Sequence, residues 1–325
     1  MALAVVAATS CSTKEDKSTI GKQTPKVVNG LMTPEVLWSF GRVAGAQVSP
    51  DGIKVLYSVS YYSIPDNKGN SEIFVMNADG SDKKQITKTS TREAAAKWMK
   101  DGEHIAFLSS ESGTMQLWIM KDDGSDRKQI TEREGGVNDF AFSPDEKKIL
   151  FVADVKYGER TVDKYPDLPK ASGVIVKDLM YKHWDEWTQT VPHPFVADFS
   201  GSKVENEVDI LNGEPFESPM KPFGGIEQLA WSPDGKTVAY TCRKITGKAY
   251  ALSTNSDIYF YNLESKTVLV TANDCFHGSF EFTIKQNEPI ESDLDILKPI
   301  IEKLCNKIIN SMEVSPNFDF RLTKK

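Results

Sequence analysis

The sequence contains few of the side chains from which reactive centres are usually built. Four histidines and four cysteines occur among its 325 residues, and the cysteines are widely scattered, at Cys11, Cys242, Cys275 and Cys305. They show neither a dense disulfide framework nor the regular spacing of metal-binding cysteines. No two histidines have the i, i+4 spacing of a zinc-binding helix. We therefore expect neither a metal site nor a cofactor.

Several catalytic and binding motifs are also absent from the sequence. It contains no Gly-x-Ser-x-Gly nucleophile elbow and no glycine-rich phosphate loop. The net charge is −7 and no basic stripe occurs, which argues against nucleic-acid binding. No apolar run approaches the length of a membrane span. With 39% hydrophobic and 26% charged residues, the composition is that of an ordinary soluble globular protein.

What the sequence does contain is a repeated turn. Segment 231–235 reads Trp-Ser-Pro-Asp-Gly and leads into an apolar run, and related segments begin at Val48, Trp98 and Phe142. Proline presets the backbone for a type I turn, serine and aspartate hydrogen-bond to nearby backbone groups, and glycine adopts the exit conformation. Apolar residues on both sides predict the two strands of a β-hairpin. The starting residues are 50, 44 and 89 positions apart, so the last gap spans about two periods, or one period with an insertion.

A second repeat has the same period. Residues 73–87 and 117–131 are offset by 44, and nine of the fifteen aligned positions are identical. Several short strands in a unit of this length are typical of a β-propeller blade. The runs Ile-Phe-Val-Met and Leu-Trp-Ile-Met are apolar on both strand faces, which suits a blade packed between two neighbours. The sequence therefore predicts an all-β fold, a partial β-propeller of about four blades, each a four-stranded antiparallel sheet. The alternative is a β-sandwich with coincidental turns.

The ends of the chain differ in character from the repeats. A short apolar stretch precedes Cys11, and this is typical of a bacterial lipoprotein signal whose cysteine is lipidated. The alternative is a soluble, irregular N-terminus that happens to contain a cysteine. With the polar tether that follows, this predicts a first segment at 1–29. Blades are predicted at 30–269, beginning with a short helix capped by Thr33. The tail at 270–325 carries apolar residues at helical spacing, which predicts a short amphipathic helix.

The most unusual residues follow a predicted inserted loop. Residues 156–172 show no strand pattern, and loops on propeller faces commonly carry function. Just beyond them, Trp184 and Trp187 are interleaved with Asp185 and Glu186. Carboxylates of this kind could hold an amine while aromatic rings wall the pocket. The alternative, which the pattern alone favours, is a blade strand whose aromatic residues pack inside and whose acids face water.

Several of these segments together resemble a known family. Residues 31–43 and the first Ser-Pro-Asp-Gly turn are similar to the start of bacterial prolyl-oligopeptidase-family (S9) serine peptidases. Segments 178–187, 193–198 and 223–235 are similar to the dipeptidyl peptidase V branch of that family. The resemblance covers about 239 residues, from 30 to 268, and the block 178–187 is its most specific part.

The resemblance implies an N-terminal propeller that covers a catalytic α/β-hydrolase domain and limits access to short peptides. It also implies that acidic residues help to hold the free N-terminus of the substrate, with Glu186, Asp185, Trp184 and Trp187 as candidate substrate-binding residues. The chain shows only about four blades and none of the catalytic motifs. We therefore expect the substrate-gating portion of a secreted dipeptidyl peptidase, truncated before the hydrolase domain and inactive alone.

The competing hypothesis is a stand-alone envelope propeller, like those of TolB-type proteins, that binds a protein or peptidoglycan partner. For both functions we expect localisation to the bacterial cell envelope, periplasmic or surface-exposed, with membrane attachment only through a lipid on Cys11. A peptide is the expected substrate of the complete enzyme. Open blade edges predict self-association, because unpaired sheet edges and exposed apolar faces invite contact with other chains.

Overall fold

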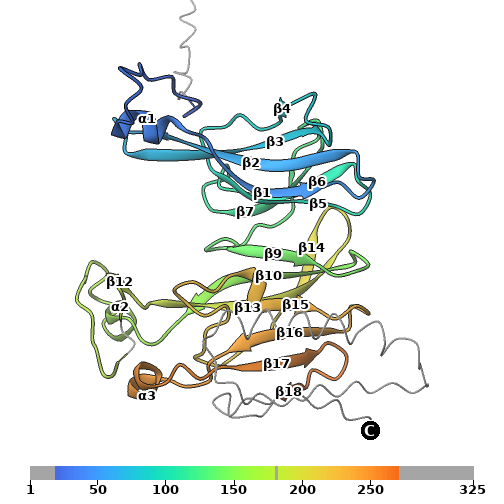
Figure 1. Cartoon of the computed structure of the whole chain (residues 1–325). Helices are drawn as coiled ribbons and strands as arrows, with labels where there is room; N and C mark the ends of the chain where they lie inside the picture. The colour runs from blue at the N-terminus through green and yellow to red at the C-terminus, as the bar shows by residue number, and fades with distance from the viewer. Residues whose placement is uncertain (1–18, 180–181, 271–325) are drawn as a thin grey trace, which may run out of the picture. The chain divides into compact units, whose positions relative to one another are not determined.

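The structure, a computed structural model, describes residues 19–179 and 182–270. The chain separates into two compact units. The first contains the residues up to 155 together with 194–212, and the second contains 156–193 and the residues from 213 onward. Four four-stranded sheets form the framework of the described residues (Figure 1). The predicted architecture of about four blades is confirmed, whereas Cys11 and the predicted tail helix lie outside the described residues.

The first and second sheets are simple antiparallel meanders, in which each strand pairs with the next along the chain. The strands of the first sheet are β1 (Arg42–Val48), β2 (Lys54–Ser63), β3 (Lys68–Asn77) and β4 (Lys84–Gln85). Those of the second are β5 (Glu93–Trp98), β6 (His104–Ser109), β7 (Gln116–Lys121) and β8 (Lys128–Gln129). The two stretches that repeat at an offset of 44 thus form the last two strands of each sheet, β3 and β4 in the first and β7 and β8 in the second.

The third and fourth sheets keep the same strand order but carry insertions. The third runs β14-β13-β10-β9 and contains β9 (Asp139–Phe142), β10 (Lys148–Lys156), β13 (Thr190–Phe199) and β14 (Val204–Asp209). Between β10 and β13 the chain forms α2 (Thr161–Lys164), β11 (Lys182–His183) and β12 (Glu186–Trp187). The fourth sheet contains β15 (Leu229–Trp231), β16 (Thr237–Cys242), β17 (Asp257–Asn262) and β18 (Val268–Val270), with η1 (Ile226–Gln228) before it and α3 (Gly247–Leu252) between β16 and β17.

The Ser-Pro-Asp-Gly turns form as their residue chemistry predicts. In the first turn the amide of Gly52 donates to the Ser49 carbonyl at 2.9 Å, and Gly52 has a φ of +78°, which favours glycine. The Ser49 hydroxyl donates to the Asp51 carboxylate at 2.5 Å, and this bond holds the pKa of Asp51 below its usual value. The same serine-to-aspartate bond recurs between Ser143 and Asp145 and between Ser232 and Asp234.

A short helix precedes the first sheet, also as predicted. It is α1 (Pro34–Ser39), whose first residue is proline. The Thr33 hydroxyl accepts a hydrogen bond from the Val36 amide at 3.3 Å and caps the helix. Proline fits this first position because its missing N–H would have no partner inside the helix.

The three sheets of the first unit bury their faces against one another. One cluster joins the first sheet to the second, through residues such as Leu56, Ile73 and Phe107. A larger cluster joins the second sheet to the third, and Phe140 in it is fully buried. Burying each such side chain contributes about 1.5–3 kcal/mol. In the second sheet the apolar pattern on both strand faces therefore reflects a blade with a neighbour on each side.

Polar links also join successive sheets of the first unit. The Gln47 side-chain amide on β1 donates to the Ala96 carbonyl on β5 at 3.1 Å. Fifty residues further on, Lys97 on β5 donates to the Phe140 carbonyl on β9. Both side chains follow a bulge in their strand, and a bulge redirects the residues beside it. The repeat thus preserves a link between sheets even though the linking residue changes.

The second unit has its own aromatic core on the fourth sheet. Tyr240 is 1% exposed and stacks on Tyr259, with ring centroids 5.2 Å apart. Burial raises the pKa of Tyr259 to about 12. Cys242 at the end of β16 is fully buried, and burial raises the pKa of its thiol to about 12. This thiol is therefore protonated at neutral pH and is not a nucleophile.

Candidate functional site

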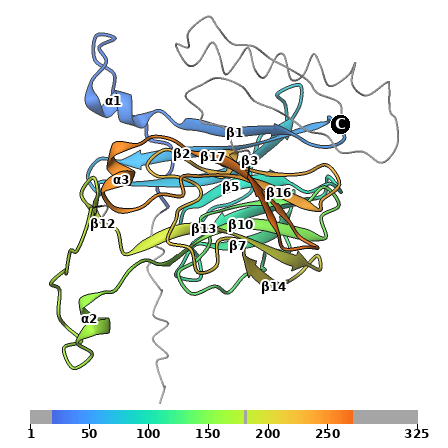
Figure 2. The same ribbon diagram turned by 90° about the horizontal axis from the view of Figure 1, so that it is seen from below.

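The loop inserted in the third sheet is closed at its base. The Tyr157 amide, one residue after β10, donates to the Gln189 carbonyl, one residue before β13, at 2.9 Å. The helix α2 and the pair β11–β12 belong to this loop and are part of none of the four-stranded sheets; α2 and β12 are labelled on the loop in Figure 2. The loop was predicted at 156–172, and the structure extends it to the start of β13.

The aromatic and acidic block forms a tight hairpin within this loop. Lys182 pairs with Trp187 and His183 pairs with Glu186. Trp184 occupies the turn with a φ of +51°, and its ring stacks on His183 at 5.7 Å. The Lys182 ammonium lies 4.7 Å from the centre of the Trp187 ring. This arrangement is a short two-stranded hairpin and not part of a blade.

The four predicted binding residues are exposed on the hairpin. Trp184 is 72% exposed and Trp187 is 45% exposed, and Asp185 and Glu186 also face solvent. The interpretation that the aromatic residues pack inside a blade is therefore wrong. The predicted grouping of these residues is present, and Trp187 lines a cavity.

That cavity has a volume of about 390 Å³ and lies within the inserted loop, beside the hairpin. One wall comes from Tyr157 to Val162, and another from Ala171 to Leu179, which includes the apolar run 174–176. Trp187 to Gln189 complete the lining. The cavity thus combines apolar and aromatic walls with charged groups, a composition typical of small-molecule and peptide pockets.

The carboxylate of Asp178, an exposed residue, lies against Gly247. A β-carbon built on Gly247, the first residue of α3, would lie 2.2 Å from the Asp178 carboxylate. Gly247 also has a φ of +60°. Glycine therefore serves two purposes here, since it permits both the backbone conformation and the close approach of the carboxylate.

A second, smaller cavity of about 30 Å³ adjoins the first through two shared residues, Tyr157 and Thr188. Glu217 and Tyr250 line it, and the Tyr250 hydroxyl donates to the Glu217 carboxylate. Burial raises the pKa of the Tyr157 phenol, and the charges of Asp178 and Glu217 raise it further. Two carboxylates thus give the region around Tyr157 a negative potential.

Two cations near the smaller cavity, Arg243 and Lys244, bind groups other than Glu217 and Asp178. Arg243 donates to the carbonyls of Tyr250 and Ser253, at 3.3 and 3.0 Å. Lys244 forms an ion pair with Glu214 at 2.5 Å. These cations leave the acidic character around Tyr157 in place. The larger cavity is itself lined by two acids, Glu159 and Asp178, and two cations, Arg160 and Lys177, so the acidic excess is confined to the surroundings of Tyr157.

Sequence reasoning singled out the block 178–187 but did not predict that it forms a hairpin, and it missed Tyr157, Glu217, Tyr250 and Gly247. These residues come from segments far apart in the chain and carry no local motif. Among the described residues, no group of three or more histidine, cysteine, aspartate or glutamate side chains could hold a metal ion. In the same part of the chain, no helix has the length and apolar character needed to cross a bilayer.

Comparison with known proteins places this arrangement in context. Residues 22–168 match the family described as the TolB beta propeller domain. The chain is 56% identical over 234 residues to dipeptidyl-peptidase 5 of Porphyromonas gingivalis, a match that covers 72% of this chain and 34% of the relative. It is 44% identical over 239 residues to dipeptidyl-peptidase 5 of Porphyromonas endodontalis, covering 74% and 35%. The chain thus spans about a third of the length of these curated relatives.

A solved structure shows the same fold at low sequence identity. The uncomplexed acylaminoacyl peptidase of Pyrococcus horikoshii superposes with a TM-score of 0.51 and 16% identity, over 72% of this chain and 32% of that one. The repeated blades and these matches define a TolB-type β-propeller. More particularly, the chain belongs to the S9 peptidase family and corresponds to the propeller portion of a dipeptidyl-peptidase 5-type member.

Proposed function

We propose that this chain is the substrate-gating propeller portion of a secreted dipeptidyl peptidase, in which the hairpin and the cavity beside it hold the N-terminal part of a short peptide. The cavity beside Trp187 carries the proposal. Its aromatic and apolar walls suit peptide side chains, and the names of the relatives supply the substrate class.

The ammonium group of the peptide would meet the acids of the hairpin. Glu186 is the first candidate and Asp185 the alternate, and both are exposed and within two residues of Trp187. An ammonium group can contact an aromatic face and a carboxylate together. Trp184 would cover the peptide from the turn of the hairpin. The free amine distinguishes this substrate from peptides with a blocked N-terminus.

Binding of the full chain to paired ligands tests the proposal. A dipeptide amide and its N-acetylated form would be titrated while tryptophan fluorescence is recorded. We expect the free amine to bind more tightly, and Glu186→Gln to weaken its binding by about 5- to 10-fold, the range between an exposed ion pair and a charge-assisted hydrogen bond. Trp187→Ala should weaken the binding of both ligands, because both would use the cavity.

The control is Glu264→Gln, which removes the same charge from an exposed residue on the fourth sheet's last turn. It should leave both affinities unchanged. Equal affinity for the free and acetylated peptides, or an equal loss in the Glu264 variant, would refute the assignment of the hairpin as an amine site.

The place of the protein in the cell belongs to the same proposal. We assign it to the bacterial envelope, because the family of its propeller is that of TolB, with Cys11 as the site of a lipid anchor. Self-association is consistent with the exposed apolar residues on β1 and on the turn between β1 and β2. These are Val43, Val48 and Ile53, which are 65%, 60% and 59% exposed.

A further inference from the structure

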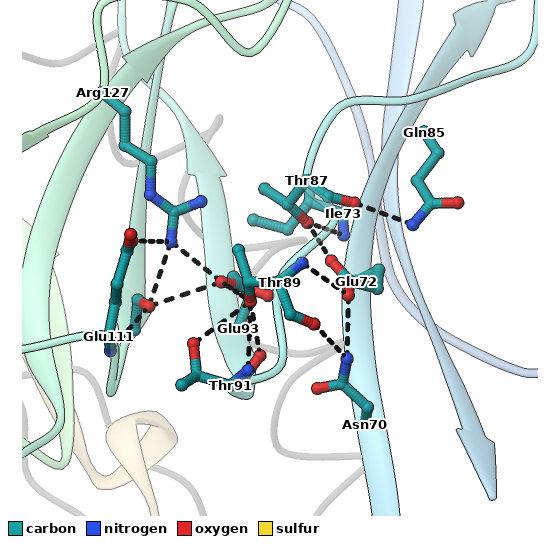
Figure 3. Close-up of polar contacts among 11 residues, drawn as sticks. Asn70, Glu72, Ile73, Gln85, Thr87, Thr89, Thr91, Glu93, Glu111 and Arg127 are labelled. Carbon is teal, nitrogen blue, oxygen red and sulfur yellow. Dashed lines mark hydrogen bonds and ion pairs between the residues drawn. The ribbon is translucent and has the colours of Figure 1, made fainter. Parts of the chain in front are cut away.

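Two carboxyl groups are buried together where the first sheet meets the second. Glu72 on β3 is 2% exposed and Glu93 at the start of β5 is fully buried. Figure 3 shows the two side chains with Thr89 between them. Buried glutamates are rare unless their charge is compensated, since moving an ionised carboxylate out of water is costly.

Neutral groups surround the Glu72 carboxyl. It accepts hydrogen bonds from the Asn70 side-chain amide at 2.8 Å, the Thr87 hydroxyl at 2.7 Å and the Thr89 backbone amide at 3.1 Å. None of these donors carries a charge. They satisfy the oxygen atoms of Glu72 without neutralising an ionised carboxylate.

The Glu93 carboxyl has one cation and one oxygen without a partner. Its Oε1 accepts from Arg127 at 2.9 Å and from the Thr89 hydroxyl at 2.8 Å. Its Oε2 is buried and has no hydrogen-bond partner among the described residues. Arg127 also pairs at 2.9 Å with Glu111, which is about half exposed. Arg127 and Glu111 are the charged groups that face the pair; Arg127 contacts Glu93 and Glu111, whereas the hydrogen-bond donors to Glu72 are all neutral.

The next blade shows that this position works with a neutral side chain. Gln116 lies 44 residues after Glu72, and its oxygen accepts from the Thr131 hydroxyl at 2.8 Å and the Arg133 amide at 3.1 Å. Its nitrogen donates to the Arg133 carbonyl at 2.7 Å. In the first blade the Asn70 amide makes the corresponding bond, to the Thr89 carbonyl at 2.9 Å. Asn70 and Glu72 together thus replace one glutamine, and the loop geometry requires no charge.

We propose that Glu72 and Glu93 share one proton and form a pH-sensitive latch between the first two blades. The buried Oε2 of Glu93, which has no hydrogen-bond partner among the described residues, is an oxygen that can carry the proton. Gain of the proton leaves one negative charge, which Arg127 compensates. Loss of the proton leaves two buried negative charges beside a single arginine, and the contact between the blades weakens.

The direction of the pH effect follows from the folded and unfolded states. Burial raises the pKa of Glu72 to about 7 and the charge of Glu93 raises it as well, although the hydrogen bond from Thr87 acts to lower it. The unfolded chain releases the same proton near pH 4.5. Between these values the folded state holds the extra proton. Stability contributed by the latch is therefore present at low pH and is lost as the pH rises toward about 7.

Thermal unfolding of the full chain between pH 5 and pH 8 tests the latch. Glu72→Gln reproduces the side chain found at residue 116 and removes the titrating group. We expect it to melt close to the wild type at pH 5 and at least about 2 °C above it at pH 8. Glu111→Gln is the matched control, because it removes a charge from the same arginine at an exposed position. Its difference from the wild type should not change over this range.

Infrared spectroscopy of the wild type gives a second measurement that does not depend on variant stability. At pH 6 exposed carboxyl groups are ionised, so a remaining absorption of a protonated carboxyl would report the shared proton. It should persist in Glu111→Gln and disappear in Glu72→Gln. A wild type without this absorption, or a melting difference between wild type and Glu72→Gln that is the same at pH 5 and pH 8, would overturn the latch.

Discussion

The hydroxyl of Thr131 supports a buried hydrogen-bond network in the second blade. It accepts from the Leu117 amide at 2.9 Å and donates to the Gln116 oxygen at 2.8 Å. Leu117 is fully buried, and Gln116 and Thr131 are nearly so. Thr131→Val keeps the shape of the side chain and removes both hydrogen bonds. The Gln116 oxygen keeps the Arg133 amide as a donor, but the Leu117 amide loses this partner.

The expected change in the free energy of unfolding follows from the hydrogen bonds that Thr131→Val removes. A buried amide left without a partner costs about 1–3 kcal/mol, and the lost bond to Gln116 adds about 0.5–1.5 kcal/mol. The added methyl group returns about 0.8 kcal/mol. We therefore expect Thr131→Val to lower the free energy of unfolding by about 2 kcal/mol, with an unchanged dependence on urea concentration. Urea unfolding of the full chain, with hydrogen exchange at the Leu117 amide, measures this.

Thr114→Val provides the matched control. Thr114 is exposed and accepts from the Gln116 side-chain nitrogen at 2.8 Å, but that nitrogen also donates to the Arg133 carbonyl. No buried group loses its last partner, so the effect should stay within about 0.5 kcal/mol. The reasoning fails if Thr131→Val is as stable as the wild type, or if the exposed substitution costs as much as the buried one.

Three further predictions concern other parts of the chain. Gly247→Ala should lower the free energy of unfolding, measured with urea, by more than about 1 kcal/mol, because the new methyl group would meet Asp178. Gly213→Ala is the control. Gly213 also has a positive φ, but no atom lies near its added methyl group, so this variant measures the backbone cost alone and should lose less stability. Cys11→Ala should abolish membrane partitioning and the mass of the acyl groups, and a soluble, unmodified protein that retains residues 1–10 would contradict lipidation. The purified chain should show no turnover of dipeptidyl substrates and no labelling by a fluorophosphonate, since peptidase chemistry needs a nucleophile, base and oxyanion donors in mutual reach; a single labelled serine whose replacement by alanine abolishes turnover would refute this.

The blades could be predicted because their information is local. Each Ser-Pro-Asp-Gly turn contains its own hydrogen-bonding groups, and the Ser49 and Asp51 side chains make the contacts that their spacing predicts. The offset of 44 between Glu72 and Gln116 also preserved equivalent contacts with a following threonine. Period and turn chemistry therefore fixed the number and type of sheets.

The site was harder to predict because its parts meet only through tertiary structure. Alternation of aromatic and acidic residues suits a blade strand and a hairpin equally well. Trp184 became a turn residue with a positive φ, which the sequence does not reveal. Tyr157 and Glu217 approach each other across a loop and a separate segment, without a shared motif. The buried pair of Glu72 and Glu93 was missed for the same reason, since burial of an acid depends on packing between sheets.

The bond between Tyr157 and Gln189 has a consequence for how such proteins vary. It holds together the two points where the chain leaves and rejoins the third sheet. A closed base of this kind lets the loop be exchanged for another of different length, because each doubling of a flexible loop costs only about 0.6 kcal/mol. The third sheet would then stay the same while the loop changes. A loop of different sequence could bind different ligands without any change in the blade.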